Sequence, residues 1–180
     1  LSTVLFLFIP HLFDLKKKDE PIKNYLFKNY GLTLSQYENI KYNPLPRPNF
    51  EIQNAKIEIN QRTIPVNVTS LIIFPKLYNI YNFENLEIDK IFLNNNQILL
   101  SDSDLKIFID YIFSLKKKIT FKNLNIKIER NKEHLINLKK IYLKNYGYDK
   151  NIVKGEIFNK NFKISINDNQ NEINFKLFKT

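Results

Sequence analysis

Apolar and polar residues alternate along most of this chain. In residues 55–59, 124–128 and 162–166, Ala, Ile, Leu or Phe alternates with Lys, Asn, Glu or Ser. Successive side chains of a β-strand point to opposite faces, so the alternation predicts strands with one apolar and one polar face. We expect a strand or strand pair within 32–42, and strands at about 50–60, 63–73, 86–93, 98–101, 119–130, 134–145, 151–159, 162–167 and 172–178. The pattern predicts a mainly β protein of the α+β kind, built on one long antiparallel sheet.

The apolar positions change parity inside two of these segments. In 50–60 the apolar side chains stand at even positions before Asn54 and at odd positions after it, and in 86–93 the same change falls at Asp89 and Lys90. A bulge or bend at these points keeps the apolar side facing inward. Such bends curl a sheet, so we expect strong twist and a groove or taco shape with an apolar inner face.

Two helices are predicted beside the sheet. Residues 14–30 carry acidic residues just before Pro21, and Gly31 suits the left-handed conformation that ends a helix. Residues 102–116 follow a Ser-Asp-Ser-Asp run that can cap a helix and complement its dipole. We expect the first, amphipathic helix to lean on the start of the sheet and the second to cover part of it.

The extreme N-terminus is strongly apolar, with a continuous run formed by Val4, Leu5, Phe6, Leu7, Phe8 and Ile9. As a helix, residues 1–13 would rise about 20 Å, short of the ~30 Å hydrocarbon core of a bilayer. We expect the C-terminal part of a membrane-anchor helix; the apolar region of a signal peptide and an ordinary buried segment are the alternatives. The lysines at 16–18 do not fix the membrane orientation, because the positive-inside rule compares the Lys and Arg content on the two sides of a membrane segment. The chain thus divides into an anchor (1–13), an amphipathic helix (14–31) and a sheet (32–180), which we expect to continue beyond the last residue.

The net charge of +10 comes from 28 Lys and Arg against 18 Asp and Glu, but only Arg47, Arg62 and Arg130 are arginines. The lysines accompany abundant Asn, Ile, Phe and Tyr, a set favoured by AT-rich codons. Nucleic-acid readers rely on arginine for bidentate contacts, so we expect no specific nucleic-acid partner. A soluble basic RNA binder remains the least favoured alternative.

Residues suited to catalysis are scarce. The chain has no cysteine, which excludes thiol catalysis, disulfides and cysteine-based zinc sites. His11 and His134 have no neighbours at ligand spacing, and no serine stands in a nucleophile pattern. The paired carboxylates fall at helix starts or in loops, where capping and solvation explain them. We therefore expect neither an enzyme, nor a metal site, nor a cofactor.

The strands offer more apolar surface than two helices can cover. An uncovered apolar surface of more than a few hundred Å2 is normally a binding or assembly site. Acyl chains suit such a surface, because each buried CH2 contributes about 0.8 kcal/mol without directional contacts. The expected lining of this lipid groove is Ile57, Ile59, Val66, Val68, Ile88, Leu93, Phe121, Leu124, Ile126, Ile128, Ile157, Ile164, Ile166 and Phe175.

The order of parts is itself informative. An apolar segment ending in Phe8-Ile9-Pro10 precedes a Lys-rich helix, and then come the runs NYGLTL (29–34), IKYNPLPRPNFEI (40–52), SLIIFPKLY (70–78) and FSLKKKI (113–119). This layout resembles the N-terminal region of the AsmA family, envelope proteins of Gram-negative bacteria. The chain departs from the family at Leu32, where members often carry a basic residue, and at Glu38-Asn39, where they carry a glycine.

The resemblance implies an inner-membrane anchor followed by a periplasmic, taco-like sheet with an apolar lumen, similar in form to bridge-like lipid carriers. The family is associated with lipid movement toward the outer membrane, or with lipid homeostasis and biogenesis there. We therefore expect passive sheltering of acyl chains, with phospholipid or another acyl lipid as partner and envelope proteins as further partners. The alternative is a structural envelope or surface β-protein whose apolar face is filled by itself or by a partner.

Overall fold

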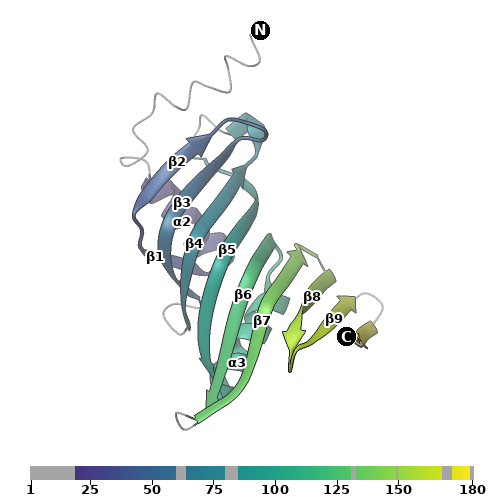
Figure 1. The fold of residues 1–180 in the computed structure, drawn as a ribbon. Helices are drawn as coiled ribbons and strands as arrows, with labels where there is room; N and C mark the ends of the chain where they lie inside the picture. The colour runs from purple at the N-terminus through teal and green to yellow at the C-terminus, as the bar shows by residue number, and fades with distance from the viewer. Residues whose placement is uncertain are drawn as a thin grey trace.

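The computed structural model describes residues 19–59, 64–79, 85–130, 133–148, 150–167 and 172–178. Ten strands form one open sheet in this part of the chain, accompanied by two α-helices and a short 3-10 turn (Figure 1). The elements are α2 (Asp19–Tyr30), β1 (Leu32–Gln36), β2 (Asn39–Asn43), β3 (Asn49–Ile59), β4 (Ile64–Pro75), η3 (Leu77–Asn79), β5 (Ile88–Ser101), α3 (Asp102–Ser114), β6 (Lys118–Arg130), β7 (Glu133–Tyr146), β8 (Lys150–Ile157), β9 (Lys160–Asn167) and β10 (Glu172–Leu177). The mainly β fold class predicted from the sequence is confirmed.

The strands follow the order β1-β3-β4-β5-β6-β7-β8-β9-β10, and β2 also pairs with β3. All pairs are antiparallel except β5 and β6, which run parallel. The prediction of a wholly antiparallel sheet is wrong at this pair. Parallel neighbours need a crossover of a dozen or more residues, and the 13-residue helix α3 supplies it. The two segments predicted at 86–93 and 98–101 are one continuous strand, β5.

A row of local bends crosses the middle of the sheet. Asn54, Asn95, Asn123 and Lys140, on β3, β5, β6 and β7, adopt left-handed φ values between 48° and 51°. Asn95 lies beside Asn123, and the Nδ2 of Asn123 donates a hydrogen bond of 2.8 Å to the Oδ1 of Asn95. Left-handed residues of this kind bend a strand and increase its twist.

Both predicted parity changes are confirmed. Before Asn54 the buried side chains of β3 include Phe50 and Ile52, and after it they include Ile57 and Ile59. On β5 the register against β4 shifts opposite Phe74 and Pro75, where Asp89 and Lys90 interrupt the buried positions. The bends keep one face of β3 and of β5 buried on both sides of the parity change.

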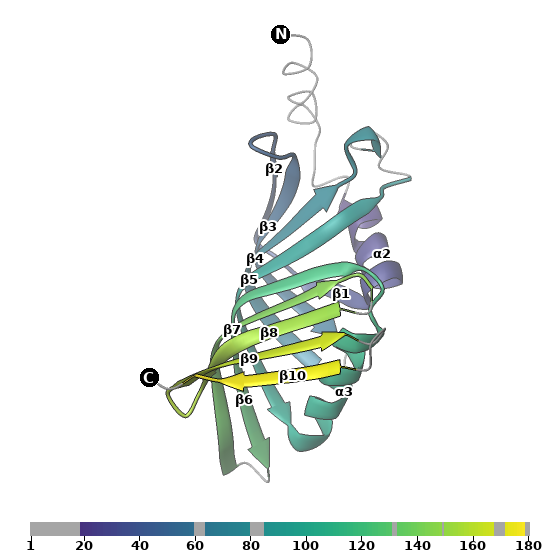
Figure 2. The ribbon, with the colours of Figure 1, turned by 90° about the vertical axis from the view of Figure 1, so that its right-hand side faces the viewer.

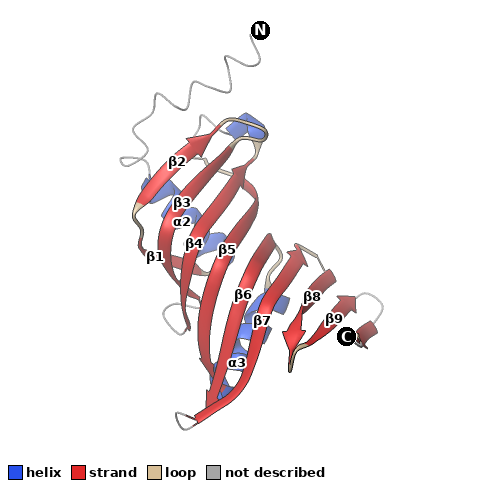
Figure 3. Ribbon diagram, in the orientation of Figure 1, coloured by secondary structure: helices blue, strands red, loops and turns tan. Residues whose placement is uncertain are grey.

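Both helices lie on the same side of the sheet, and the strand direction turns strongly between β6 and β10 (Figures 2 and 3). Gly31 follows α2 with φ 62°, and its N–H donates to the Phe27 carbonyl at 3.0 Å, which confirms the predicted helix end. Ser101 caps α3 in a capping box with Asp104, also as predicted. Residues 14–18 of the first predicted helix lie outside the described residues, and α3 ends two residues before the predicted boundary.

The predicted anchor, with Val4, Leu5, Phe6, Leu7, Phe8 and Ile9, also lies outside the described residues. Within the described part of the chain, neither helix has the length and apolar character needed to cross a bilayer.

Candidate functional site

The face of the sheet that carries the helices, which we call the inner face, is closed over most of its length. α2 contributes the buried side chains Ile22, Leu26 and Tyr30, and α3 contributes Phe108, Tyr111 and Ile112. They belong to one core together with ten of the residues predicted to line a lipid groove, all of them buried: Ile57, Ile59, Val66, Val68, Ile88, Leu93, Phe121, Leu124, Ile126 and Ile128. In this structure these ten side chains contact protein and not solvent.

Buried hydrogen bonds hold α3 in place. The Tyr111 hydroxyl donates to the carbonyl of Tyr30 at the end of α2, at 2.7 Å. The Nδ2 of Asn145, on β7, donates to the carbonyls of Ile112 (2.7 Å) and Leu115 (2.9 Å) at the C-terminal end of α3. These carbonyls have no partner inside the helix, so Asn145 satisfies groups that would otherwise be buried unpaired. Burial also raises the pKa of the Tyr111 hydroxyl well above its usual range, so the group remains a donor.

The inner face becomes exposed toward the C-terminus. One row of paired residues crosses the sheet from β5 to β10 and consists of Leu93, Phe121, Leu143, Val153, Ile164 and Phe175. The first three side chains are buried, Val153 and Ile164 are half-buried, and Phe175 is 60% exposed. The contacts of α3 concentrate on β5 and β6, so the apolar row continues past the helix that covers it.

The last strand shows the exposure most clearly. Ile173, Phe175 and Leu177 are 74%, 60% and 50% exposed on the inner face of β10, whereas polar residues alternate with them on the other face. We call the accessible part of the inner face the C-terminal apolar face; it consists of Val153, Ile157, Ile164, Ile166, Ile173, Phe175 and Leu177.

Four predicted groove residues therefore belong to this accessible surface. Ile157, Ile164 and Ile166 are half-buried and Phe175 is exposed. Val153, Ile173 and Leu177 also belong to this surface but were not among the predicted groove residues. The signal was present for the last two, because they share the parity of Phe175 in the alternating segment 172–178.

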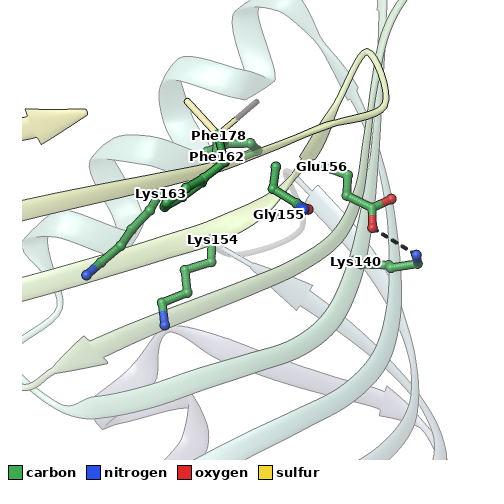
Figure 4. A pocket seen from close by; sticks show the side chains of 8 residues that line it. Lys140, Lys154, Gly155, Glu156, Phe162, Lys163 and Phe178 are labelled. Carbon is green, nitrogen blue, oxygen red and sulfur yellow. Dashed lines mark hydrogen bonds and ion pairs between the residues drawn. The ribbon is translucent and has the colours of Figure 1, made fainter. Parts of the chain in front are cut away.

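A hollow of about 500 Å3 opens at β8 and β9. Lys154 and Lys163 in its lining alternate with Val153 and Ile164, so these two lysines lie on the face opposite the C-terminal apolar face. Phe162 and Phe178 lie together at one end of it, and an ion pair of 2.8 Å joins Lys140 Nζ to Glu156 Oε1 on the other side (Figure 4). The side chains of Lys154 and Lys163 point in a common direction, away from that ion pair. The hollow thus combines apolar rings with cationic groups, as an amphipathic ligand requires.

Gly155 shapes this region of the sheet. A Cβ at this position would stand 2.2 Å from the Cδ1 of Ile141 and 3.2 Å from the Lys139 carbonyl oxygen. The Ile141 side chain therefore packs directly on the backbone of β8. Any side chain at this position would push the buried isoleucine of β7 away.

No set of three potential metal ligands occurs among the described residues. His134 lies in the exposed first part of β7, and His11 lies outside the described residues. The expectations that the chain is not an enzyme and binds no cofactor stay predictions.

No protein-family model matches this chain, and no curated protein matches it significantly.

Proposed function

We propose that this protein binds acyl lipid on the C-terminal apolar face and shelters the chain passively, in lipid transfer or in lipid homeostasis of the outer membrane. The observation that carries the proposal is the apolar row of paired residues on the inner face, which continues from Leu93 and Phe121 in the core onto Val153, Ile164 and Phe175 of β8, β9 and β10. A one-sided apolar surface of this kind is unusual on a soluble monomer and marks a site that is covered in use.

We assign the acyl chain to strands β8 to β10 and not to the whole inner face of the sheet. α2 and α3 already fill the space over the strands that hold the ten buried residues. On β8 to β10 an acyl chain would replace water on apolar side chains, gaining about 0.8 kcal/mol per buried CH2.

The cellular part of the proposal rests on the sequence. The apolar segment 1–13 and the resemblance to the AsmA family support an inner-membrane anchor with the β-domain in the periplasm. Phospholipid or another acyl lipid is then the proposed ligand, and envelope proteins are further partners. No catalytic step is part of the proposal.

The test is the lipid content of the purified full-length chain. The double substitution Ile173→Ser and Phe175→Ser should lower the amount of co-purified acyl lipid at least about tenfold, because each exposed side chain offers about 1.5–3 kcal/mol of apolar contact. Lipid is extracted and quantified by mass spectrometry against protein. Segment 1–13 is present in every sample, so lipid bound there cancels in the comparison.

Leu99→Ser with Phe158→Ser is the matched control, since both side chains are exposed apolar groups away from this face. The control should retain the lipid content of the unchanged chain. Equal lipid content in all three proteins, or an equal fall in both variants, would contradict the proposal.

The structural alternative has one observation in its favour. The outer edge of β10 pairs with no strand among the described residues, and such an edge can add a strand from another protein. In that case the unchanged chain would carry no more lipid than the Ile173→Ser, Phe175→Ser variant, and Phe175→Ser would lower its apparent mass in solution.

A further inference from the structure

The face of the sheet opposite the helices, which we call the outer face, carries a cluster of cationic side chains near β5 to β8. We call it the outer-face basic cluster; its members are Arg47, Lys90, Lys118, Lys122, Lys144 and Lys150. The proposed lipid role does not use this cluster.

A hollow of about 420 Å3 lies at the centre of the cluster. The strand register explains it, because the small Thr120 of β6 stands between Phe92 of β5 and Lys144 of β7. In the neighbouring row, Lys118 stands between Lys90 and Tyr146. Three lysines and four aromatic residues line the hollow around the short side chain of Thr120; the aromatic residues are Phe92, Tyr142, Tyr146 and Tyr148. The volume falls in the range of small-ligand sites.

Aromatic rings hold the ammonium groups in position. Lys90 Nζ lies 5.0 Å from the centroid of the Phe92 ring, and Lys122 Nζ lies 4.4 Å from the same centroid. Lys144 Nζ lies 4.1 Å from the centroid of the Tyr146 ring. A cation–π contact orients an ammonium group without neutralising its charge, so each group can still bind an anion.

Carboxylates compensate little of this charge. Asp89 is bonded to Arg47 (2.9 Å) and Lys118 (3.1 Å). Partial burial alone would raise the pKa of its carboxyl, but these two cations outweigh burial and lower the pKa. Among the described residues, no carboxylate lies within 4.0 Å of the ammonium group of Lys90 or Lys144.

The pKa of Lys90 reflects its partial burial and the positive charge of the surrounding side chains. Its pKa is lowered, first by partial burial and then by the positive charge of Arg47, with smaller contributions from Lys144 and Lys118. An anion that enters the hollow would stabilise the protonated, charged form of Lys90.

We propose that this hollow binds a phosphate group. Each lysine presents up to three donors on a compact positive charge, which suits phosphate, and the rings of Phe92 and Tyr146 suit the organic part of the ligand. Three of the lysines line one hollow, which fits one phosphate better than the extended backbone of a nucleic acid. The phosphate can belong to a lipid headgroup or to a soluble molecule, and the inference does not depend on the proposed lipid role.

The first test is a calorimetric titration of the full-length chain with glycerol 3-phosphate, with glycerol as the uncharged comparison. Saturable binding is expected for the phosphate alone. The substitutions Lys90→Gln and Lys144→Gln together should weaken it at least about tenfold, since each removes a charge-assisted contact. These variants should fold normally, because the loss of Lys90 relieves repulsion; the urea midpoint checks this point.

Lys56→Gln with Lys127→Gln is the matched control. Both lysines are exposed on β3 and β6, away from the hollow, and the pair removes the same total charge. The control should bind glycerol 3-phosphate as the unchanged chain does. Absent binding, or an equal loss in both pairs of variants, would overturn the proposal.

A second test separates the sources of the phosphate. Sedimentation with phosphatidylcholine vesicles, with and without phosphatidic acid, compares the unchanged chain with the Lys90→Gln, Lys144→Gln variant. A difference that appears only with phosphatidic acid identifies a lipid headgroup, and equal sedimentation of the two proteins identifies a soluble ligand. Oligothymidylate that binds more tightly than glycerol 3-phosphate, and is lost in the same variant, would replace the proposal with nucleic-acid binding.

Discussion

Replacing Phe121 with alanine should lower the free energy of unfolding by about 3–5 kcal/mol. Phe121 is fully buried at the centre of the sheet, between Leu93 of β5 and Leu143 of β7. Its ring also meets the ring of Phe108 on α3, with centroids 6.0 Å apart at an interplanar angle of 74°. The substitution therefore leaves a cavity at the point where the covering helix joins the sheet. Urea unfolding, followed by circular dichroism, measures the loss as a lower midpoint at an unchanged slope.

Phe158→Ala is the matched control for this experiment. Phe158 is 75% exposed in the turn after β8, so its removal should change the free energy of unfolding by less than about 0.5 kcal/mol. Similar losses at the two positions would mean that Phe121 is accessible, and would favour an open lumen in place of the closed core described here.

Replacing Asn145 with alanine should cost about 2–4 kcal/mol, the second-largest expected effect. The change removes both hydrogen bonds to the carbonyls of Ile112 and Leu115, and those carbonyls stay buried without a partner. The last turn of α3 should then exchange its amide hydrogens faster, while the amides of β3 and β4 keep their protection. Hydrogen exchange with mass spectrometry distinguishes this local effect from general destabilisation.

Asn67→Ala serves as the control, because Asn67 is exposed on the outer face of β4. It should leave both stability and exchange unchanged. Unchanged exchange in α3 of the Asn145→Ala protein would contradict the role given to this side chain.

Much of the fold could be predicted because the physical signal is local. Alternation located the strands, and the parity change at Asn54 located a bend, since a strand that keeps one face buried must bulge where its apolar positions shift. The same signal existed at Asn95 and Asn123, where the buried positions also change parity, but it was not used. Inside β5, the run Asn94-Asn95-Asn96 looked like a connection because asparagine is rare in strands, whereas the structure accommodates it as a bend.

The parts that could not be predicted depend on distant contacts. The parallel pairing of β5 and β6 follows from where α3 returns the chain, and no single segment specifies it. Which apolar residues are covered depends likewise on the position of the helices. Ile126 and Ile164 have the same alternating pattern, yet one is buried under the core and the other is half-buried near the free edge.

The most direct measurement of the central claim is face-specific photocrosslinking on β10. Benzoylphenylalanine replaces Phe175, on the apolar side, or its neighbour Asn174, on the polar side, in the full-length chain. After irradiation in membranes, we expect mass spectrometry to detect acyl-lipid adducts at position 175 and almost none at 174. Equal adducts at both positions, or protein adducts alone at 175, would contradict a lipid-binding C-terminal apolar face.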